Sequence, residues 1–250
     1  MAKANVAKYF SNEDSANEIF SDSVFSNGFI IEKLLDGNEQ FRGIMQSSKI
    51  KTMSGKDMCA TNGVTSQIYL ISIELLQEDG KSSDQPTFSA IMKAFNTERI
   101  EALFQNMMNI NTDTESDKGQ TECDFYSLFG NISKEIMPIP DIYYIQKTDM
   151  EKSTPGVIIM EDLTESGWMA SVYDGLTVQQ VKTIVYHLAA FHHFLLCETD
   201  DNWSEVLVKS AFEKEEDFAH LLSDDMIEKV IEWNRGSNIW PDCMYSRTPE

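Results

Sequence analysis

A lysine and a glutamate 29 residues apart are the first candidates for chemistry in this 250-residue sequence. Lys93 lies in a segment with strand alternation, on the same side as Ile91 and Phe95. An ammonium group among apolar neighbours needs an anion, although a lysine on an edge strand can instead extend to water. Glu122, on the predicted helix over 120–129, could supply that anion, although a glutamate before two aromatic residues is usually the polar edge of an amphipathic helix.

Two further segments could offer backbone donors to a ligand. Gly63 precedes Ser66 in a turn just before a predicted strand, where N–H groups could approach a phosphate, although a single glycine more often marks an ordinary turn. Glu161, Asp162 and Leu163 close an apolar strand. This second segment is either a simple strand end or a hinge with exposed backbone donors.

The order of these four features predicts the N-terminal lobe of a kinase. A glycine turn, a strand lysine, a helical glutamate and an apolar strand ending in acids follow one another along the chain. Lys93 lies 30 residues after Gly63, and Glu122 lies 29 residues after Lys93. Glu161 follows Glu122 by 39 residues. Each feature alone has an ordinary structural explanation, and the ordered set favours the kinase interpretation.

The same residues resemble the choline-kinase-like small-molecule kinases, which are related to ecdysteroid kinases and aminoglycoside phosphotransferases and are expanded in nematodes and insects. The resemblance spans residues 48 to 200 and is carried by Gly63-x-x-Ser66-x-Ile68-Tyr69, Ile91-Met-Lys93, Glu122-x-x-Phe125-Tyr126, Val157 to Leu163 and Leu188-Ala-Ala-Phe-His192.

This resemblance implies a nucleotide site. Lys93 would contact the α- and β-phosphates of ATP and pair with Glu122, and the turn from Gly63 to Ser66 would cover the phosphates. The segment from Glu161 to Leu163 would be the hinge that receives adenine. The turn holds one glycine where two are common in the family, so we expect ATP to bind weakly.

The sequence departs from the family where phosphoryl transfer is carried out. Such kinases use His-x-Asp-x-x-x-x-Asn and a second, magnesium-binding Asp. None of the four histidines is followed two residues later by Asp; they are His187, His192, His193 and His220. The chain ends at Glu250 before the family's catalytic loop, so we expect no magnesium ligands and inefficient phosphoryl transfer by this polypeptide alone.

Periodicity predicts the elements that position these residues. Dense β-branched and aromatic residues predict strands at 48–53, 66–76, 87–95, 142–145 and 156–161. Helical spacing predicts helices at 29–41, 98–108, 120–129 and 176–197 and another that begins at Ser223. Thr177 and Gln180 match a capping box at the start of the helix over 176–197.

We therefore expect an α+β protein in three parts. Residues 1–47 would be an N-terminal extension with a helix, and residues 48–163 a kinase-like N-lobe of about five antiparallel strands plus a helix. Residues 164–250 would be a partial helical C-lobe lacking the catalytic loop.

Composition excludes several partners and predicts a compartment. The net charge is −21, with 14 acids and 10 bases in residues 1–110 but 27 acids and 10 bases in residues 111–250. Such a field repels nucleic acid and anionic membrane surfaces. No apolar run approaches the ~20 residues of a membrane helix and no secretory signal begins the chain, so we expect a cytoplasmic protein. The four widely spaced cysteines are expected to be free thiols.

Three interpretations remain open at this stage. The first is the N-terminal portion of a small-molecule kinase that retains ATP affinity. The second is a non-catalytic pseudokinase or interaction module, in which a protein partner covers the part of helix 176–197 that missing C-lobe elements would leave exposed. The third is an unrelated α+β protein, which a structure with Lys93 and Glu122 on different surfaces would favour.

Overall fold

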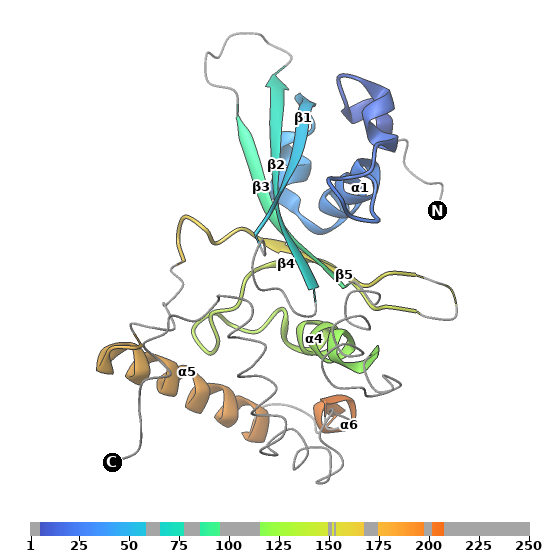
Figure 1. The fold of residues 1–250 in the computed structure, drawn as a ribbon. Helices are drawn as coiled ribbons and strands as arrows, with labels where there is room; N and C mark the ends of the chain where they lie inside the picture. Colours follow the sequence, from blue (N-terminus) through green and yellow to red (C-terminus); the bar gives the residue numbers. More distant parts are fainter. Residues whose placement is uncertain are drawn as a thin grey trace, which may run out of the picture.

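One antiparallel sheet lies between N-terminal helices on one side and later helices near its lower end (Figure 1). The computed structural model describes residues 6–58, 66–77, 86–95, 116–149, 152, 154–167, 175–197 and 202–207. In the described part, a mixed α+β arrangement confirms the predicted fold class. The five-stranded antiparallel sheet followed by helices is consistent with a kinase-like N-lobe.

All five predicted strands are present and pair in the order β1-β2-β3-β5-β4. Their bounds are β1 Ser48–Asp57, β2 Ser66–Gln77, β3 Thr87–Phe95, β4 Ile142–Gln146 and β5 Val157–Glu161. Strand β1 is longer than predicted, because its second half continues to pair with β2 past an irregularity between Ile50 and Thr52. Every neighbouring pair is antiparallel.

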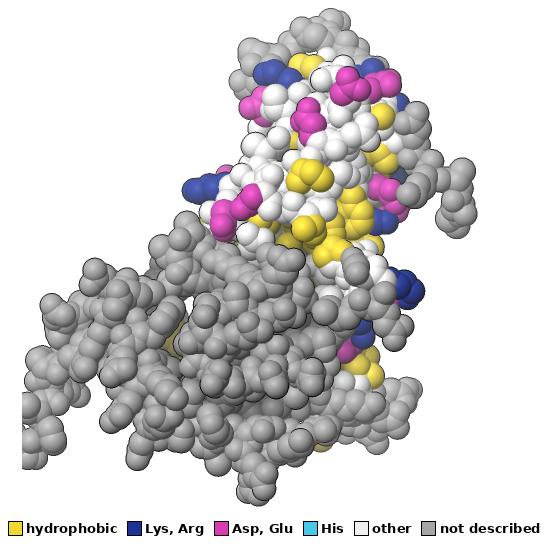
Figure 2. Space-filling model, turned by 45° about the vertical axis from the view of Figure 1, so that its right-hand side comes forward, with side chains coloured by type: hydrophobic (Ala, Val, Ile, Leu, Met, Phe, Trp, Pro, Cys, Tyr) yellow, Lys and Arg dark blue, Asp and Glu magenta, His cyan; other side chains and the backbone are white. Residues whose placement is uncertain are grey.

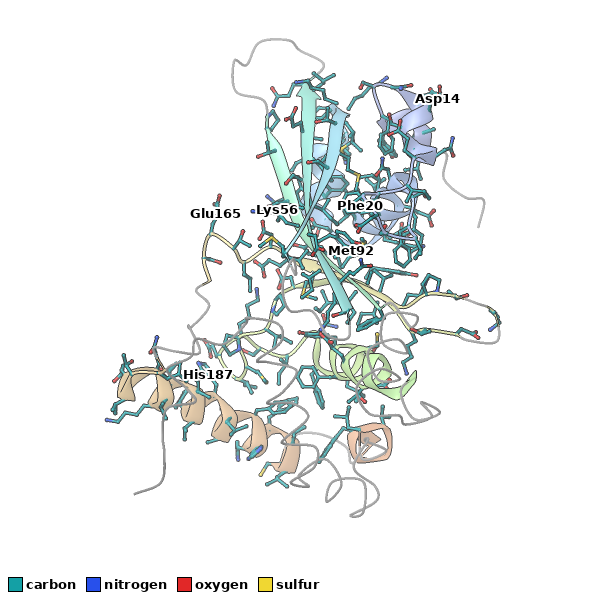
Figure 3. The ribbon with its side chains drawn as sticks, viewed as in Figure 1. Asp14, Phe20, Lys56, Met92, Glu165 and His187 are labelled. Carbon is teal, nitrogen blue, oxygen red and sulfur yellow. The ribbon has the colours of Figure 1, made fainter. Side chains whose placement is uncertain are left out.

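Residues 6–47 cover one face of the sheet and supply a large part of the main core. This segment contains the 3-10 helices η1 Val6–Tyr9 and η2 Glu13–Asn17 and the helices α1 Asn27–Gly37 and α2 Glu39–Ile44. On β2, Tyr69, Ile71, Ile73 and Leu75 alternate with less buried residues and point into this core. Phe20 and Met92 lie between the N-terminal segment and the sheet (Figure 3).

The predicted helix over 29–41 is broken into two at Asn38. Asn38 has extended backbone angles, φ −122° and ψ 110°, and its side-chain oxygen accepts a hydrogen bond from the Phe41 N–H at 2.7 Å. An asparagine in this conformation is a strong N-cap, so it ends α1 and starts α2. The apolar periodicity runs through the break and therefore could not reveal it.

The later helices are α4 Ser116–Phe129, α5 Val178–Cys197 and α6 Asn202–Leu207. The predicted capping box is confirmed at α5: the Thr177 N–H donates to Gln180 Oε1 at 2.8 Å, and the Gln180 N–H donates to Thr177 Oγ1 at 3.3 Å. On its inner side, α5 packs Phe191 and Phe194 against Phe129 of α4.

The outer side of α5 is apolar and exposed, as the sequence predicts. Its exposed apolar residues include Val178, Val181, Val185, Leu188 and Leu196, which are 44% to 80% exposed. Helical spacing places these five residues along one stripe, which Phe191, three residues after Leu188, borders on the side that faces α4.

Two predicted features lie outside the described residues. They are the helix over 98–108 and the helix that begins at Ser223. Among the helices that the structure describes, none combines the length and apolarity needed to cross a bilayer. Figure 2 shows acidic and basic side chains interspersed over the described surface of the upper part.

Candidate functional site

Lys93 and Glu122 form an ion pair between the sheet and α4. Lys93 Nζ lies 2.5 Å from Glu122 Oε2, and the two side chains are 21% and 29% exposed. A structure with these two residues on different surfaces would have favoured the interpretation of an unrelated fold, whereas here they lie together. The ammonium group also lies 5.8 Å from the centre of the Phe95 ring. Lys93 therefore lies in a partly desolvated place beside a close counter-ion.

Strand alternation explains why Lys93 points away from the main core. Its neighbours Met92 and Ala94 are buried against the N-terminal segment, so Lys93 must project from the opposite face. In register, Lys93 lies opposite Ile68 of β2 on one side and Ile158 of β5 on the other. This second face of the sheet is the one that α4 approaches.

Half-buried apolar side chains form a floor beside Lys93 on this face. We define the apolar floor as Ile68, Leu70, Ile91 and Met160. Leu70 lies opposite Ile91, and Ile91 lies opposite Met160, so these side chains continue across three neighbouring strands. A flat apolar surface beside a cation suits a ligand that has an aromatic ring at one end and negative charge at the other.

Ser66 lies at the edge of the same face, and Gly63 lies outside the described residues. Ser66 begins β2, is 5% exposed and is opposite Phe95 in register. Since Ile68 is two residues further on, Ser66 and the apolar floor share one side of β2. The predicted role of Gly63 and Ser66 in covering phosphates stays a prediction.

The side chain of Glu161 is directed to the edge of the sheet. Its Oε2 accepts hydrogen bonds from Lys134 Nζ at 3.1 Å and from the Asp141 N–H at 3.0 Å. Lys134 also pairs with Asp141 at 2.9 Å, and these hydrogen bonds raise the pKa of the exposed Lys134. The Glu161 N–H also donates to the Asp141 carbonyl at 2.8 Å, so both its carboxylate and its backbone donor already have protein partners.

The two residues after Glu161 differ in how they are held. Burial alone would raise the pKa of Asp162, but hydrogen bonds from Ser89 and Thr164 outweigh it and hold the pKa below its usual range. The Thr164 N–H donates to Asp162 Oδ1 at 2.9 Å, which fixes the turn. Leu163 is 36% exposed. The predicted hinge thus has an ordered start, and its role with adenine stays a prediction.

Helix α4 is tied to the sheet immediately after Glu122. Cys123 is fully buried with Phe95 and Ile158, and its Sγ–H donates to the Gln146 carbonyl at 3.8 Å. Burial, reinforced by the charge of Glu122, raises the pKa of the Cys123 thiol to about 11. Such a thiol is a packing residue and a poor nucleophile.

Two further contacts, one of α4 and one of α5, were not predicted from the sequence. They are the ion pair of Asp124 with Lys147 and the contact between His187 Nδ1 and the Ile136 carbonyl at 3.1 Å, which joins α5 to the loop after α4 (Figure 3). The sequence offers a signal only for the ion pair, since Asp124 is close to Glu122 and Lys147 follows a predicted strand. Among the described residues, no group of three or more His, Cys, Asp and Glu side chains could hold a metal ion.

Comparison with known families gives one match. Residues 119–242 match the family model DUF1679, described as "uncharacterized oxidoreductase dhs-27". This part of the chain is similar to that family. The matched segment begins within α4 and covers 124 of the 250 residues (242 − 119 + 1), just under half of the chain. The match is consistent with a nematode-expanded family, and its description does not name a kinase. No curated protein and no solved structure matched the chain.

Proposed function

We propose that this protein is the N-terminal portion of a small-molecule kinase-like protein and binds an adenine nucleotide on the second face of its sheet. The observation that carries the proposal is the Lys93–Glu122 ion pair at the end of the apolar floor. The adenine ring would lie on the apolar floor. The phosphates would lie at Lys93, the cation whose orientation Glu122 holds.

The chemistry of this pair explains why the ligand would be a phosphate ester. A lysine paired with one carboxylate still has donors left on its ammonium group, so it can accept a second anion. The second half of the chain is strongly acidic, so the net charge of the protein does not attract an anionic ligand. The affinity would therefore depend on this local cation and on stacking over the floor, and we expect it to be weak.

Phosphoryl transfer by this polypeptide alone would be inefficient. The printed sequence holds no His-x-Asp-x-x-x-x-Asn segment, so the base that accepts the proton of the substrate hydroxyl is missing. Magnesium, which the resemblance implies, would contribute charge neutralisation at the phosphates. Among the described residues, no group of three or more His, Cys, Asp and Glu side chains could hold the ion by protein ligands alone.

The oxidoreductase named in the family description fits the described residues less well. Dinucleotide-binding oxidoreductases commonly use a parallel sheet and a G-x-G-x-x-G turn. Here every pair of neighbouring described strands is antiparallel. In addition, no two of the twelve glycines in the sequence are two residues apart. These observations support the kinase-like interpretation.

Calorimetry with a non-hydrolysable ATP analogue tests the proposal. We expect weak, saturable binding that Lys93→Met reduces at least about tenfold, the usual effect of losing a charge-assisted contact. Lys51→Met is the matched control, since Lys51 pairs with Glu74 on the surface of the same sheet at 3.2 Å. Absence of binding by a folded wild-type sample would contradict the proposal.

A second candidate function is a non-catalytic interaction module. The exposed apolar stripe of α5 favours it, because such a surface on a soluble helix is commonly covered by a protein. Co-purification from native extract, compared between the wild type and Val185→Lys, is the relevant test. A chain that runs alone and monodisperse in both forms would contradict this function. The nucleotide-binding candidate suits the cytosol, where ATP is abundant and thiols stay reduced.

A further inference from the structure

Three consecutive residues of α4 contact three different parts of the sheet. Glu122 pairs with Lys93 of β3, and Cys123 is buried in a cluster with Phe95 and Ile158. The Asp124 carboxylate pairs with Lys147 Nζ, just beyond the end of β4. Since successive residues of an α-helix point about 100° apart, these contacts together fix the rotation of α4 about its own axis.

The pair of Asp124 with Lys147 is asymmetric in burial. The Asp124 side chain is 17% exposed, whereas the Lys147 side chain is 50% exposed. Loss of the lysine would leave a carboxylate that is largely removed from water without its counter-ion. Helix α4 would relieve this by turning Asp124 toward solvent, and the same rotation would draw Glu122 away from Lys93.

We infer that Asp124 is a positioning residue, whose ion pair with Lys147 holds α4 in the rotation that presents Glu122 to Lys93. The effect on α4 follows from these contacts alone. The effect on ligand binding rests on the proposed nucleotide site. The two effects therefore need separate readouts.

Cys123 reports the position of α4 without any ligand. Its thiol is fully buried, so an alkylating reagent reaches it only when α4 opens locally. The rate of iodoacetamide modification, followed by mass spectrometry of the peptide that contains Cys123, measures this opening. Resolving the peptide separates Cys123 from the exposed Cys197.

We expect Asp124→Asn to accelerate modification of Cys123 about threefold to tenfold, the range for loss of a partly exposed ion pair. Asp124→Glu retains the charge and should restore most of the protection. Lys147→Gln changes a half-exposed side chain and should act in the same direction while leaving the fold intact. Glu74→Gln removes an ion pair on the exposed surface of the sheet and is the matched control, expected to leave the rate unchanged. Equal rates in wild type, Asp124→Asn and Lys147→Gln would overturn the inference.

Affinity for the ATP analogue, measured on the same variants, tests the second part. If the wild type binds, Asp124→Asn should weaken binding about threefold to tenfold in parallel with the modification rate. Faster modification with unchanged affinity would overturn the link between Asp124 and the site. The wild type could bind no nucleotide while Asp124→Asn still speeds modification of Cys123. That result would support the role of Asp124 in placing α4 and contradict the proposed function.

Discussion

Lys93 of β3 and Glu122 of α4 are 29 residues apart in the sequence, and their charged atoms lie 2.5 Å apart in the structure. The contact is the point at which α4 meets the face of the sheet that the N-terminal segment leaves uncovered. Both side chains are partly shielded from water, so their attraction is stronger than that of a typical surface pair.

The Lys93–Glu122 pair should contribute to stability as a coupled unit. Lys93→Met or Glu122→Gln alone should lower the free energy of unfolding by about 1–2 kcal/mol, because each leaves a partly buried charge without its partner. The double variant should be less destabilised than the sum of the two single variants. Urea unfolding of all four proteins measures the coupling. Strict additivity would show that the pair contributes no interaction energy.

Gly37 should be intolerant of any side chain. A Cβ atom at Gly37 would lie 1.8 Å from the carbonyl oxygen of Tyr143, so α1 and β4 would have to separate. We expect Gly37→Ala to lower the free energy of unfolding by about 2 kcal/mol or more. Gly43→Ala is the control, since nothing lies within 4 Å of a Cβ there and alanine favours the helix. Similar unfolding midpoints for the two variants would contradict this account.

Cys123 should make stability fall at alkaline pH. Burial raises the pKa of its thiol from 9.0 to about 11, so the folded protein holds this proton more tightly than the unfolded chain. The stabilisation is complete below pH 9 and is lost as the pH rises through 11. Urea unfolding between these limits should show a smaller decrease in Cys123→Ala than in the wild type. Cys197→Ala, at an exposed thiol, should follow the wild type.

The start of α5 should depend on its capping box. Thr177→Ala removes the acceptor for the Gln180 N–H and should cost the helix about 1 kcal/mol. Hydrogen exchange of the first-turn amides should then be faster by about fivefold. Thr183→Ala is the control, because Thr183 is within the helix and its hydroxyl donates to the Gln179 carbonyl at 3.1 Å. Equal protection in both variants would mean that tertiary packing, and not the cap, holds this end.

Much of the described framework could be predicted because its signals are local. The strands that became β2, β3 and β5 are dense in β-branched and apolar residues, and backbone alternation alone placed Lys93 on the face opposite Met92. The start of α5 is determined by hydrogen bonds between residues three apart. Such contacts are formed by neighbouring residues and do not depend on the rest of the chain.

The break between α1 and α2 could not be predicted from periodicity. Apolar residues keep helical spacing across Asn38, and only its conformation and its hydrogen bond to Phe41 show that one helix ends and another begins there. The sequence also did not show how much of the core residues 6–47 would supply. An amphipathic segment shows that it will bury one face but does not show which surface will cover that face.

The sequence by itself determined the five strands, the start of α5, the side of β3 on which Lys93 lies and the candidate partner Glu122. Only the tertiary structure decided that Glu161 turns to Lys134 and that Asp124 meets Lys147. Both contacts join residues more than 20 positions apart, and their geometry depends on strand register and on the rotation of α4. Register and rotation are set by packing of the whole core, because no local bond along the chain specifies them.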